Sequence, residues 1–261
     1  TYIYIPKNLK NKKDIYDLVE IVDILRGENG CPWDREQTHE SIKNAIIEES
    51  YEVADAIEKE DDNGVIEELG DVLFQVIFHA AIGKEDGYYN LSDIIEGICN
   101  KMIYRHPHVF GNADVNTTEE VLANWDELKK KEKHFNTMTD ELNGVAKALP
   151  ALIRAAKVQK KAKKVGFDFE NVDKTLEKIK EEINELEEVY KTDNVDRITE
   201  ELGDLLFSCV NTARFLNVDS EEALNKCINK FIERFSYIEN TAISLGLNLK
   251  EMSLKEMDEL W

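Results

Sequence analysis

The sequence has no long apolar run and little positive charge for its length of 261 residues. No apolar stretch approaches the roughly 18 residues that a membrane-spanning helix needs, and we expect no signal peptide. The 33 Lys and Arg residues are outnumbered by 54 Asp and Glu residues, which gives a net charge of −21. Because nucleic-acid binding requires a basic surface, we expect neither a membrane nor a nucleic acid as partner.

Cysteines are few and none of them forms a CxxC pair. The four are Cys31, Cys99, Cys209 and Cys227. The last three fall within apolar helical patterns, so we expect them to be small core residues. This usage favours a reducing, cytoplasmic setting.

Several catalytic signatures are also absent. The sequence has no Gly-rich phosphate loop, no Walker pattern and no plausible Ser-His-Asp set. The acidic helices described below lack the Glu-x-x-His motif of di-iron bundles. His79 lies eight residues after Asp71, but the equivalent position of the second half is Thr212. A dinuclear iron site is therefore disfavoured.

What the sequence does contain is two closely spaced pairs of acids. Glu182 and Glu185 are three residues apart, and so are Glu201 and Asp204. Residues at this spacing share one face of a helix, and apolar residues flank both pairs, which places the acids beside a core seam. Two such helices packed antiparallel would gather four carboxylates. A divalent cation is the simplest compensation for their repulsion, and oxygen ligands favour Mg²⁺ or Mn²⁺.

The same acidic pattern occurs a second time, 133 residues earlier. Residues 67–74 read EELGDVLF and residues 200–207 read EELGDLLF, so seven of the eight positions are identical. The repeat supplies the equivalent candidate ligands Glu49, Glu52, Glu68 and Asp71. Solvated helix surface is the alternative, but repetition of type and spacing favours a metal site. Gly70 and Gly203 lie between the acids and indicate either a close approach or tight helix packing.

Basic and aromatic residues form a second repeated pattern. Lys101 and Arg105 in the first half match Lys230 and Arg234 in the second, and Arg197 lies four residues before Glu201. Beside a metal, such cations are suited to bind phosphate, whereas a solvated basic face is the alternative. Trp125 and Trp261 are candidates either for the core or for stacking on a nucleobase. The basic run at 154–164 is expected to be a solvated helix face.

Apolar spacing predicts an all-α chain with almost no strand. The expected helices span 14–26, 40–59, 63–84, 91–105, 117–133, 145–164, 173–191, 195–216, 220–244 and 254–261, with an irregular turn at 31–34. We expect an N-terminal domain at 1–134, a linker at 135–144 and a C-terminal domain at 145–261. Each would be a four-helix-bundle-like unit that dimerisation completes.

Ordered motifs over nearly the whole chain carry a family resemblance. They are GCPWD at 30–34, the EExxE and ExxD motifs at 48–52, 68–71, 181–185 and 201–204, RHPHVF at 105–110, LPAL at 149–152 and VGFD at 165–168. In these the chain resembles MazG, the nucleoside triphosphate pyrophosphohydrolase of the all-α superfamily. Residues 1–11 are not typical of a stand-alone MazG and are compatible with a junction to a further domain, such as a methylase-like one.

The resemblance implies tandem MazG domains, usually dimeric, that use Mg²⁺ to cleave nucleoside triphosphates into monophosphate and pyrophosphate. It also implies that Glu182, Glu185, Glu201 and Asp204 hold the metal and that Lys230, Arg234 and Trp261 contact the nucleotide. The C-terminal half would be the more active one. Broad base specificity and a housecleaning role in the nucleotide pool are further expectations.

The expected mechanism assigns the attacking water to a glutamate. Glu181 is the candidate because it precedes the ligand pair and lies four residues from Glu185, and Glu48 is its equivalent in the first half. Lys230 and Arg234 would neutralise the pyrophosphate end. Two alternatives stay open at this point: a nucleotide-binding or helical interaction module without turnover, and a chain in which one half is catalytic and the other mainly dimerises.

Overall fold

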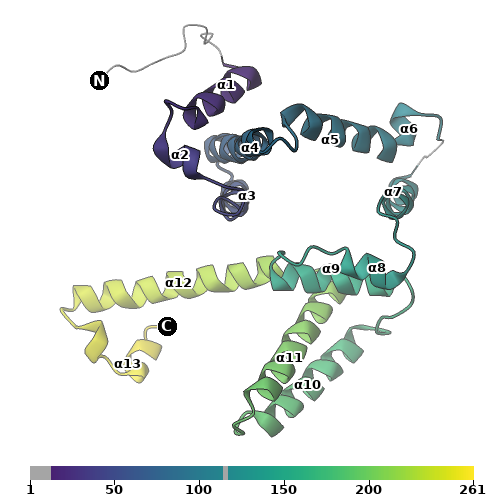
Figure 1. Cartoon of the computed structure of the whole chain (residues 1–261). Helices are drawn as coiled ribbons and strands as arrows, with labels where there is room; N and C mark the ends of the chain where they lie inside the picture. The colour runs from purple at the N-terminus through teal and green to yellow at the C-terminus, as the bar shows by residue number, and fades with distance from the viewer. Residues whose placement is uncertain (1–12, 114–116) are drawn as a thin grey trace. The chain divides into compact units, whose positions relative to one another are not determined.

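The computed structural model of the protein describes residues 13–113 and 117–261, and these form helices joined by turns, with no strand among them. The chain divides into two compact units, Thr1–Leu128 and Lys129–Trp261 (Figure 1). The prediction of an all-α protein is therefore confirmed. The expected junction at 1–11 lies outside the described residues.

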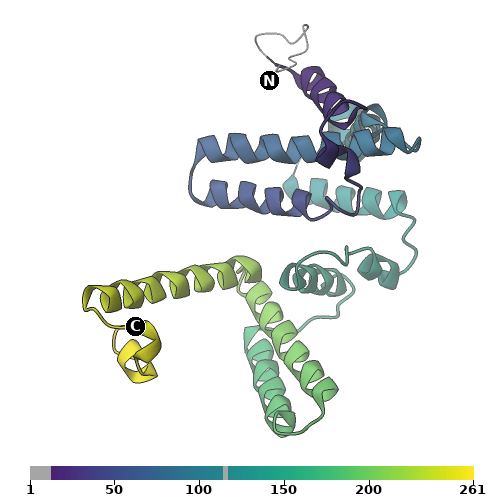
Figure 2. The same cartoon turned by 60° about the vertical axis from the view of Figure 1, so that its left-hand side comes forward.

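The first unit is built on a helical hairpin. Its helices are α1 (Ile15–Arg26), α2 (Pro32–Glu36), α3 (Ala45–Glu58), α4 (Asp62–Glu85), α5 (Leu91–Arg105), α6 (Pro107–Phe110) and the first part of α7 (Thr118–Glu132), which crosses the unit boundary. A short turn joins α3 to α4, and the two pack along each other as an antiparallel pair (Figure 2). This hairpin carries the first set of acids.

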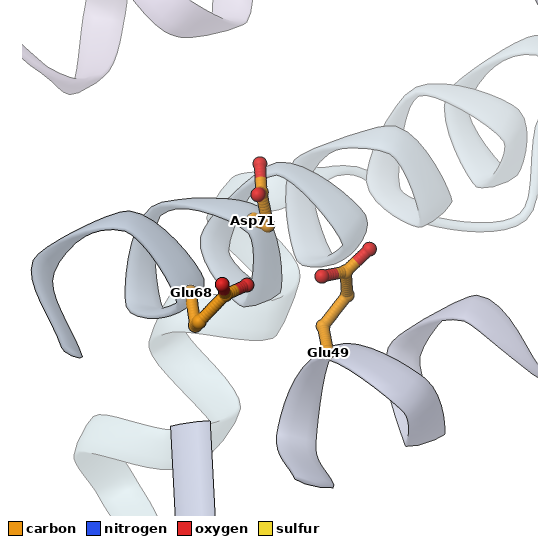
Figure 3. Close-up of side chains that lie close together, drawn as sticks. All are labelled: Glu49, Glu68 and Asp71. Atoms are coloured by element: carbon orange, nitrogen blue, oxygen red, sulfur yellow. The ribbon is translucent and has the colours of Figure 1, made fainter. Parts of the chain in front are cut away.

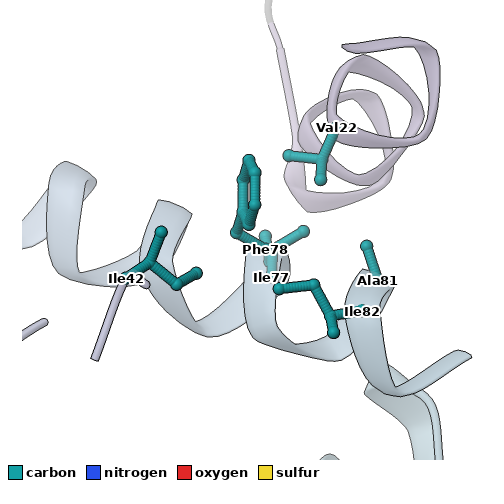
Figure 4. Close-up of a cluster of buried hydrophobic side chains, with 6 residues drawn as sticks. All are labelled: Val22, Ile42, Ile77, Phe78, Ala81 and Ile82. Carbon is teal, nitrogen blue, oxygen red and sulfur yellow. The ribbon is translucent and has the colours of Figure 1, made fainter. Parts of the chain in front are cut away.

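An apolar core holds the far half of α4 against α1. Ile77, Phe78, Ala81 and Ile82 of α4 meet Val22 of α1, and Ile42 closes the cluster (Figure 4). Phe78 is 2% exposed and Val22 is fully buried. Burying such side chains stabilises a fold by about 1.5–3 kcal/mol each, so this core fixes α4 and the acids that precede it.

The second unit is built on an equivalent hairpin. Its further helices are α8 (Met138–Asn143), α9 (Ala151–Lys163), α10 (Val172–Val189), α11 (Val195–Phe215), α12 (Ser220–Ser244), the 3₁₀ helix η1 (Leu249–Glu251) and α13 (Leu254–Asp258). α10 and α11 pack along each other, and α9 packs on α11. Figures 1 and 2 both show α12 leaving the end of α11 at a wide angle, with α13 beside its far half.

Ion pairs with little exposure connect elements of the second unit. Arg214 of α11 binds both carboxylate oxygens of Asp168, and both side chains are only 14% exposed. Glu141 of α8 is 7% exposed and pairs with Lys130 at 2.8 Å and Lys161 at 3.5 Å. The predicted linker at 135–144 thus contains a helix that is anchored to its neighbours, and the unit boundary falls earlier than the predicted limit of residue 134.

Local capping explains where most helices begin. Asp14 forms a capping box with Asp17 at the start of α1, and Asn90 does the same with Asp93 for α5. A polar side chain at the N-cap accepts hydrogen bonds from backbone N–H groups that have no partner within the helix. Asn194 caps α11 in this way by accepting from the N–H of Arg197.

Three predicted boundaries were wrong. The turn at 31–34 is instead the start of the short helix α2, because Pro32 at its first position fits a helix N-terminus. The helix predicted from residue 40 begins at Ala45, since hydrogen bonds between Thr38 and Ser41 form a turn. The helix predicted from residue 145 begins after Pro150, at Ala151.

The apolar seam beside each acidic pair is open in the single chain. In the second unit Leu202, Leu206 and Phe207 are 44–50% exposed, and Leu69 and Leu73 of the first unit are 52% and 40% exposed. The prediction that Cys99, Cys209 and Cys227 are core residues was also wrong: all three are exposed. Their helix faces are apolar in sequence, but no other helix in the described part of the chain covers them.

Candidate metal centre

The second hairpin brings three carboxylates together. Glu182 comes from α10, and Glu201 and Asp204 come from α11; one oxygen of each lies within 4.8 Å of the others. Glu182 is 3% exposed and Glu201 8%, whereas Asp204 is exposed. The atom Oε2 of Glu182 is buried and has no hydrogen-bond partner in the part of the chain that the structure describes. A buried carboxylate oxygen without a partner is costly unless a cation satisfies it.

Lysine supplies one positive charge to this cluster. Lys178 lies one turn before the acids on α10, and its Nζ contacts Glu181 and Glu182, each at 2.8 Å. These two hydrogen bonds raise the pKa of Lys178 above its usual range. Arg197 of α11 approaches Glu201 at 3.5 Å and is half exposed. The cluster is thus partly neutralised by the chain itself.

The first hairpin forms a matching triad. Glu49 of α3 and Glu68 of α4 point toward each other, with Asp71 one turn further along α4 (Figure 3). One oxygen from each of the three lies within 4.8 Å of the others. Glu49 and Glu68 are half-buried, and Asp71 is exposed. Burial, followed by the charges of neighbouring acids, raises the pKa of both Glu49 and Glu68.

The fourth acid of each set lies beside its triad rather than within it. Burial, followed by the charges of Glu182 and Glu201, raises the pKa of Glu185. The charge of Glu52 in turn raises the pKa of Glu68. Each hairpin therefore gathers the four predicted acids in one region, with three of them at close range.

Both triads fit a hard divalent cation. All the donors are carboxylate oxygens, which suit Mg²⁺ and Mn²⁺. No histidine or cysteine joins either group among the described residues. In the second unit, Oε2 of Glu182 is a candidate metal-ligand oxygen that is buried and has no hydrogen-bond partner among the described residues. The second triad is therefore the better-formed candidate centre.

Two residues of the second unit that were predicted to contact the nucleotide, Arg234 and Trp261, lie against each other. The guanidinium carbon of Arg234 lies 5.3 Å from the centre of the Trp261 ring. Phe231, one turn earlier on α12, lies 5.2 Å from the same ring. Trp261 is 42% exposed. The result is a partly open aromatic platform with a cation on one side.

The equivalent residues of the first unit are more enclosed. Arg105 is 8% exposed and lies 5.5 Å from the centre of the Trp125 ring. His106 meets the same ring edge-to-face at 5.0 Å, and its Nδ1 lies 2.6 Å from the carbonyl oxygen of Met102. Lys101 is half-buried on α5. The cation beside the tryptophan is therefore buried in the first unit, whereas Arg234 is exposed in the second.

Not every predicted site residue lies with the carboxylates. Lys230 and Arg234 are exposed on α12, which contacts α9, α11 and η1, and neither forms an ion pair among the described residues. Glu181 is exposed and bound by Lys178, while Glu48 is exposed on α3. Gly70 and Gly203 have open space where a side chain would begin, so no described residue makes the close approach that the sequence suggested as one possibility.

Sequence reasoning missed Lys178. Its spacing of three and four residues before Glu181 and Glu182 is the arrangement in which a helix pairs opposite charges. That signal was available, but Lys178 lies in a helix crowded with lysines and glutamates, where surface pairing is the ordinary expectation.

Known proteins resemble this chain over most of its length. The uncharacterized protein YabN of Bacillus subtilis is 49% identical over 266 residues, which cover 100% of this chain and 54% of YabN. This chain thus spans about half the length of YabN. The nucleoside triphosphate pyrophosphohydrolase/pyrophosphatase MazG of Thermotoga maritima is 43% identical and covers 94% of this chain and 93% of its own length.

A third relative gives the same picture. The nucleoside triphosphate pyrophosphohydrolase of Escherichia coli is 41% identical over 247 residues, 94% of each protein. The family of the MazG nucleotide pyrophosphohydrolase domain matches residues 37–110 and 170–238, which include both acidic hairpins. The chain therefore belongs to the MazG nucleotide pyrophosphohydrolase family and carries its domain twice.

Proposed function

We propose that this chain hydrolyses nucleoside triphosphates to nucleoside monophosphate and pyrophosphate, with Mg²⁺ as the natural cation and Mn²⁺ as a substitute. The observation that carries the proposal is the largely buried carboxylate cluster of α10 and α11, in which Oε2 of Glu182 has no hydrogen-bond partner among the described residues. The printed activities of the Thermotoga and Escherichia relatives support the same reaction.

Glu182, Glu185, Glu201 and Asp204 would hold the cation in the second unit, and Glu49, Glu52, Glu68 and Asp71 in the first. The bound ion would offset the negative charge of the phosphates. Glu181 would orient and deprotonate a water whose oxygen bonds to the α-phosphorus. The bond from that phosphorus to the bridging oxygen then breaks, and pyrophosphate leaves with the electron pair. Glu48 is the equivalent base of the first unit.

Nucleotide binding would use the platform on α12. Trp261 offers a ring face to any base, and stacking discriminates weakly among bases. Lys230, Arg234 and Arg197 would bind the phosphates, because exposed cations without a strong internal pair are available to an anion. Broad base specificity and a housecleaning role in the nucleotide pool follow as parts of this proposal.

Assembly as a homodimer would bring these parts together. The apolar side chains of Leu202, Leu206 and Phe207, beside the second cluster, are 44–50% exposed. A second copy covering this seam would bury it and bring a nucleotide platform closer to the carboxylates. Two bundle-like units would then be completed.

The setting we propose is the cytoplasm, without a nucleic-acid or membrane partner. The four thiols are free, as a reducing compartment would leave them. The net charge of −21 opposes binding to nucleic acid. Among the described residues, no helix has the length and apolar character that crossing a membrane would require.

A second candidate function concerns the first unit alone. The cation beside its tryptophan, Arg105, is 8% exposed, whereas Arg234 beside Trp261 is exposed, so a nucleotide has less access to Arg105 than to Arg234. This favours a first unit that binds a cation and supports assembly without turnover, as opposed to a second active site. Lys101, Arg105 and Trp125 would then be structural, and Glu48 would not act as a base.

Product analysis tests the main proposal. The full chain would be incubated with each of the common nucleoside triphosphates and Mg²⁺, and the products separated by anion exchange. We expect monophosphate and pyrophosphate in equal amounts, and a sedimentation mass of two chains. Release of orthophosphate and diphosphate in place of these products would exclude the reaction. A large rate difference between bases would contradict broad specificity.

A further inference from the structure

The two carboxylate clusters carry the same acids but different cations. Lys178 and Arg197 accompany the second cluster, whereas the positions 133 residues earlier hold Ala45 and Gly64. Lys43 and Lys59, the lysines nearest in sequence to the first cluster, pair instead with Glu40 and Asp55. Among the described residues, the first cluster therefore has no positive charge paired with its acids, whereas the second has two.

Lys178 contacts one of the acids that would hold a metal ion. Its Nζ lies 2.8 Å from Oε1 of Glu182, the most buried of the three clustered acids. The side chain of Lys178 is one-third exposed, so its stem is largely covered while its ammonium group can still reach water. The other oxygen of Glu182, Oε2, stays buried and without a partner. One oxygen of Glu182 is therefore paired with a cation while the other is not.

A divalent cation entering this cluster meets the ammonium group at short range. Two like charges at such a distance repel strongly where the surroundings are only partly wet. Lys178 has a flexible four-carbon stem and can swing outward, but it then gives up two ion pairs. An incoming polyphosphate offers replacement oxygens for the ammonium group, so metal and polyphosphate favour each other's binding.

We propose that Lys178 is a resident counter-ion that makes divalent-cation binding to the second cluster depend on a polyphosphate, whereas the first cluster takes the cation alone. Arg197, which is more exposed and more distant at 3.5 Å, contributes in the same direction with a smaller effect. The inference rests on the proposed function, because it takes both clusters to be metal sites. Lys178 thus has a positioning role in the second unit. Ala45 stands at the equivalent position of the first unit and cannot play that role.

Counting bound Mn²⁺ tests this inference without any turnover. The full chain, freed of metal by a chelator, is titrated with Mn²⁺, and the free hexaaqua ion is measured by electron paramagnetic resonance. The polyphosphate is α,β-methylene ATP, whose α–β bridge cannot be hydrolysed. We expect wild type to bind one tight Mn²⁺ per chain alone and a second one in the presence of the analogue.

Reciprocal substitutions assign the effect. Lys178→Met removes the charge and keeps the stem, and should tighten analogue-free Mn²⁺ binding at the second cluster by about tenfold. Ala45→Lys should weaken the first site by a similar factor and make it respond to the analogue. Glu68→Gln should remove the site that forms without analogue, and Asp204→Asn should remove the one that needs it. Lys174→Met, on the same helix but paired with Glu177, is the matched control and should change neither site.

The possible results test the role of Lys178 separately from the presence of the metal sites. Two equal Mn²⁺ sites in wild type without analogue, or an unchanged second site in Lys178→Met, would overturn the inference and leave the proposed metal sites standing. Failure of wild type to bind Mn²⁺ at either cluster, even with the analogue, would remove the metal from the proposed function as well. Circular dichroism of Lys178→Met and Ala45→Lys establishes that each variant is folded before its sites are counted.

Discussion

The two acidic hairpins of this protein differ less in their acids than in what surrounds them. In the second unit Glu182 and Glu201 are buried, and Lys178 and Arg197 compensate them. In the first unit Glu49 and Glu68 are half-buried, burial followed by the charges of neighbouring acids raises the pKa of both, and neither forms an ion pair among the described residues. The comparison teaches that a repeated set of ligands does not define a repeated site. Burial and counter-charge, which the motif does not contain, decide how each set behaves.

Removing one ligand from each cluster is the strongest way to break this comparison. We expect Glu182→Gln to reduce pyrophosphate release about 100-fold or more, because it removes a buried metal ligand. Glu49→Gln should reduce it less than about fivefold if the first unit has no turnover. Glu177→Gln, on the exposed side of α10, is the control and should keep wild-type activity. Equal losses from both ligand variants would mean that both units are catalytic.

The two tryptophans provide the next test. Trp261→Ala should raise the KM for the triphosphate about tenfold, because the loss of base stacking costs roughly 1–3 kcal/mol, with little change in stability. Trp125→Ala should leave KM unchanged and lower the melting temperature by roughly 5 °C, since it uncovers Arg105 and His106. Steady-state kinetics and calorimetry of both variants would separate a ligand platform from a structural ring. The reverse pattern would contradict the assignment.

Acid should weaken the first unit before the second. His79 and His39 lie 2.8 Å apart through their Nδ1 atoms, and burial, followed by the charge of His39, lowers the pKa of His79. A histidine whose pKa is lowered in the folded protein contributes its full stabilisation at pH values above its pKa in the unfolded chain, which is about 6.5. This contribution is lost as the pH falls below that value. The first unit should therefore begin to weaken below about pH 6.5.

The second unit should respond only at lower pH. Burial opposes ionisation of Asp168, but the hydrogen bonds from Arg214 outweigh it and lower its pKa. The corresponding stability is complete above about pH 3.9 and is lost as the pH falls below that value. Amide hydrogen exchange, corrected for its intrinsic pH dependence, would follow each unit separately. In His79→Gln the early loss should disappear, and its persistence would refute this account.

The smallest expected effect concerns the two helical glycines. Gly70 and Gly203 each have open space where a Cβ would lie, so Gly70→Ala and Gly203→Ala should each stabilise the protein by up to about 1 kcal/mol. Thermal unfolding of the two variants measures this. If one variant were more stable than wild type and the other less stable, another surface would approach only the hairpin of the destabilised variant. The two hairpins would then have different surroundings in the assembled protein.

The sequence predicted the helices, the tandem family and the pairing of acids because these depend on local spacing. Glu182 faces Glu201, and Glu49 faces Glu68, through a hairpin whose two helices are consecutive in the chain. The roles assigned to these acids, to Glu181 and to Lys230 remain predictions. Burial was harder to foresee: Cys209 lies in an apolar pattern and is nevertheless exposed, because apolar spacing does not say whether another helix packs over that face.

Other features depended on partners that spacing does not identify. The Asp168–Arg214 pair joins residues 46 positions apart, and the Arg26–Glu85 pair joins residues 59 apart. Many acids were available to each arginine, so composition alone could not select one. Proline and side-chain hydrogen bonds shifted helix starts at α3 and α9 by several residues for the same reason: local turn chemistry competed with the apolar pattern.

The hairpin construction of each cluster has a consequence for how the protein folds. All the clustered acids of a unit come from two successive helices, α3 with α4 or α10 with α11, so their contacts are short in sequence. Contacts of this kind form early and rapidly, because little chain entropy is lost in closing a short loop. Each acidic pair can thus be assembled while the rest of its unit is still unfolded. Lys178 then serves the nascent α10–α11 hairpin by neutralising two of its carboxylates, whereas the α3–α4 hairpin reaches the same stage with its charges uncompensated.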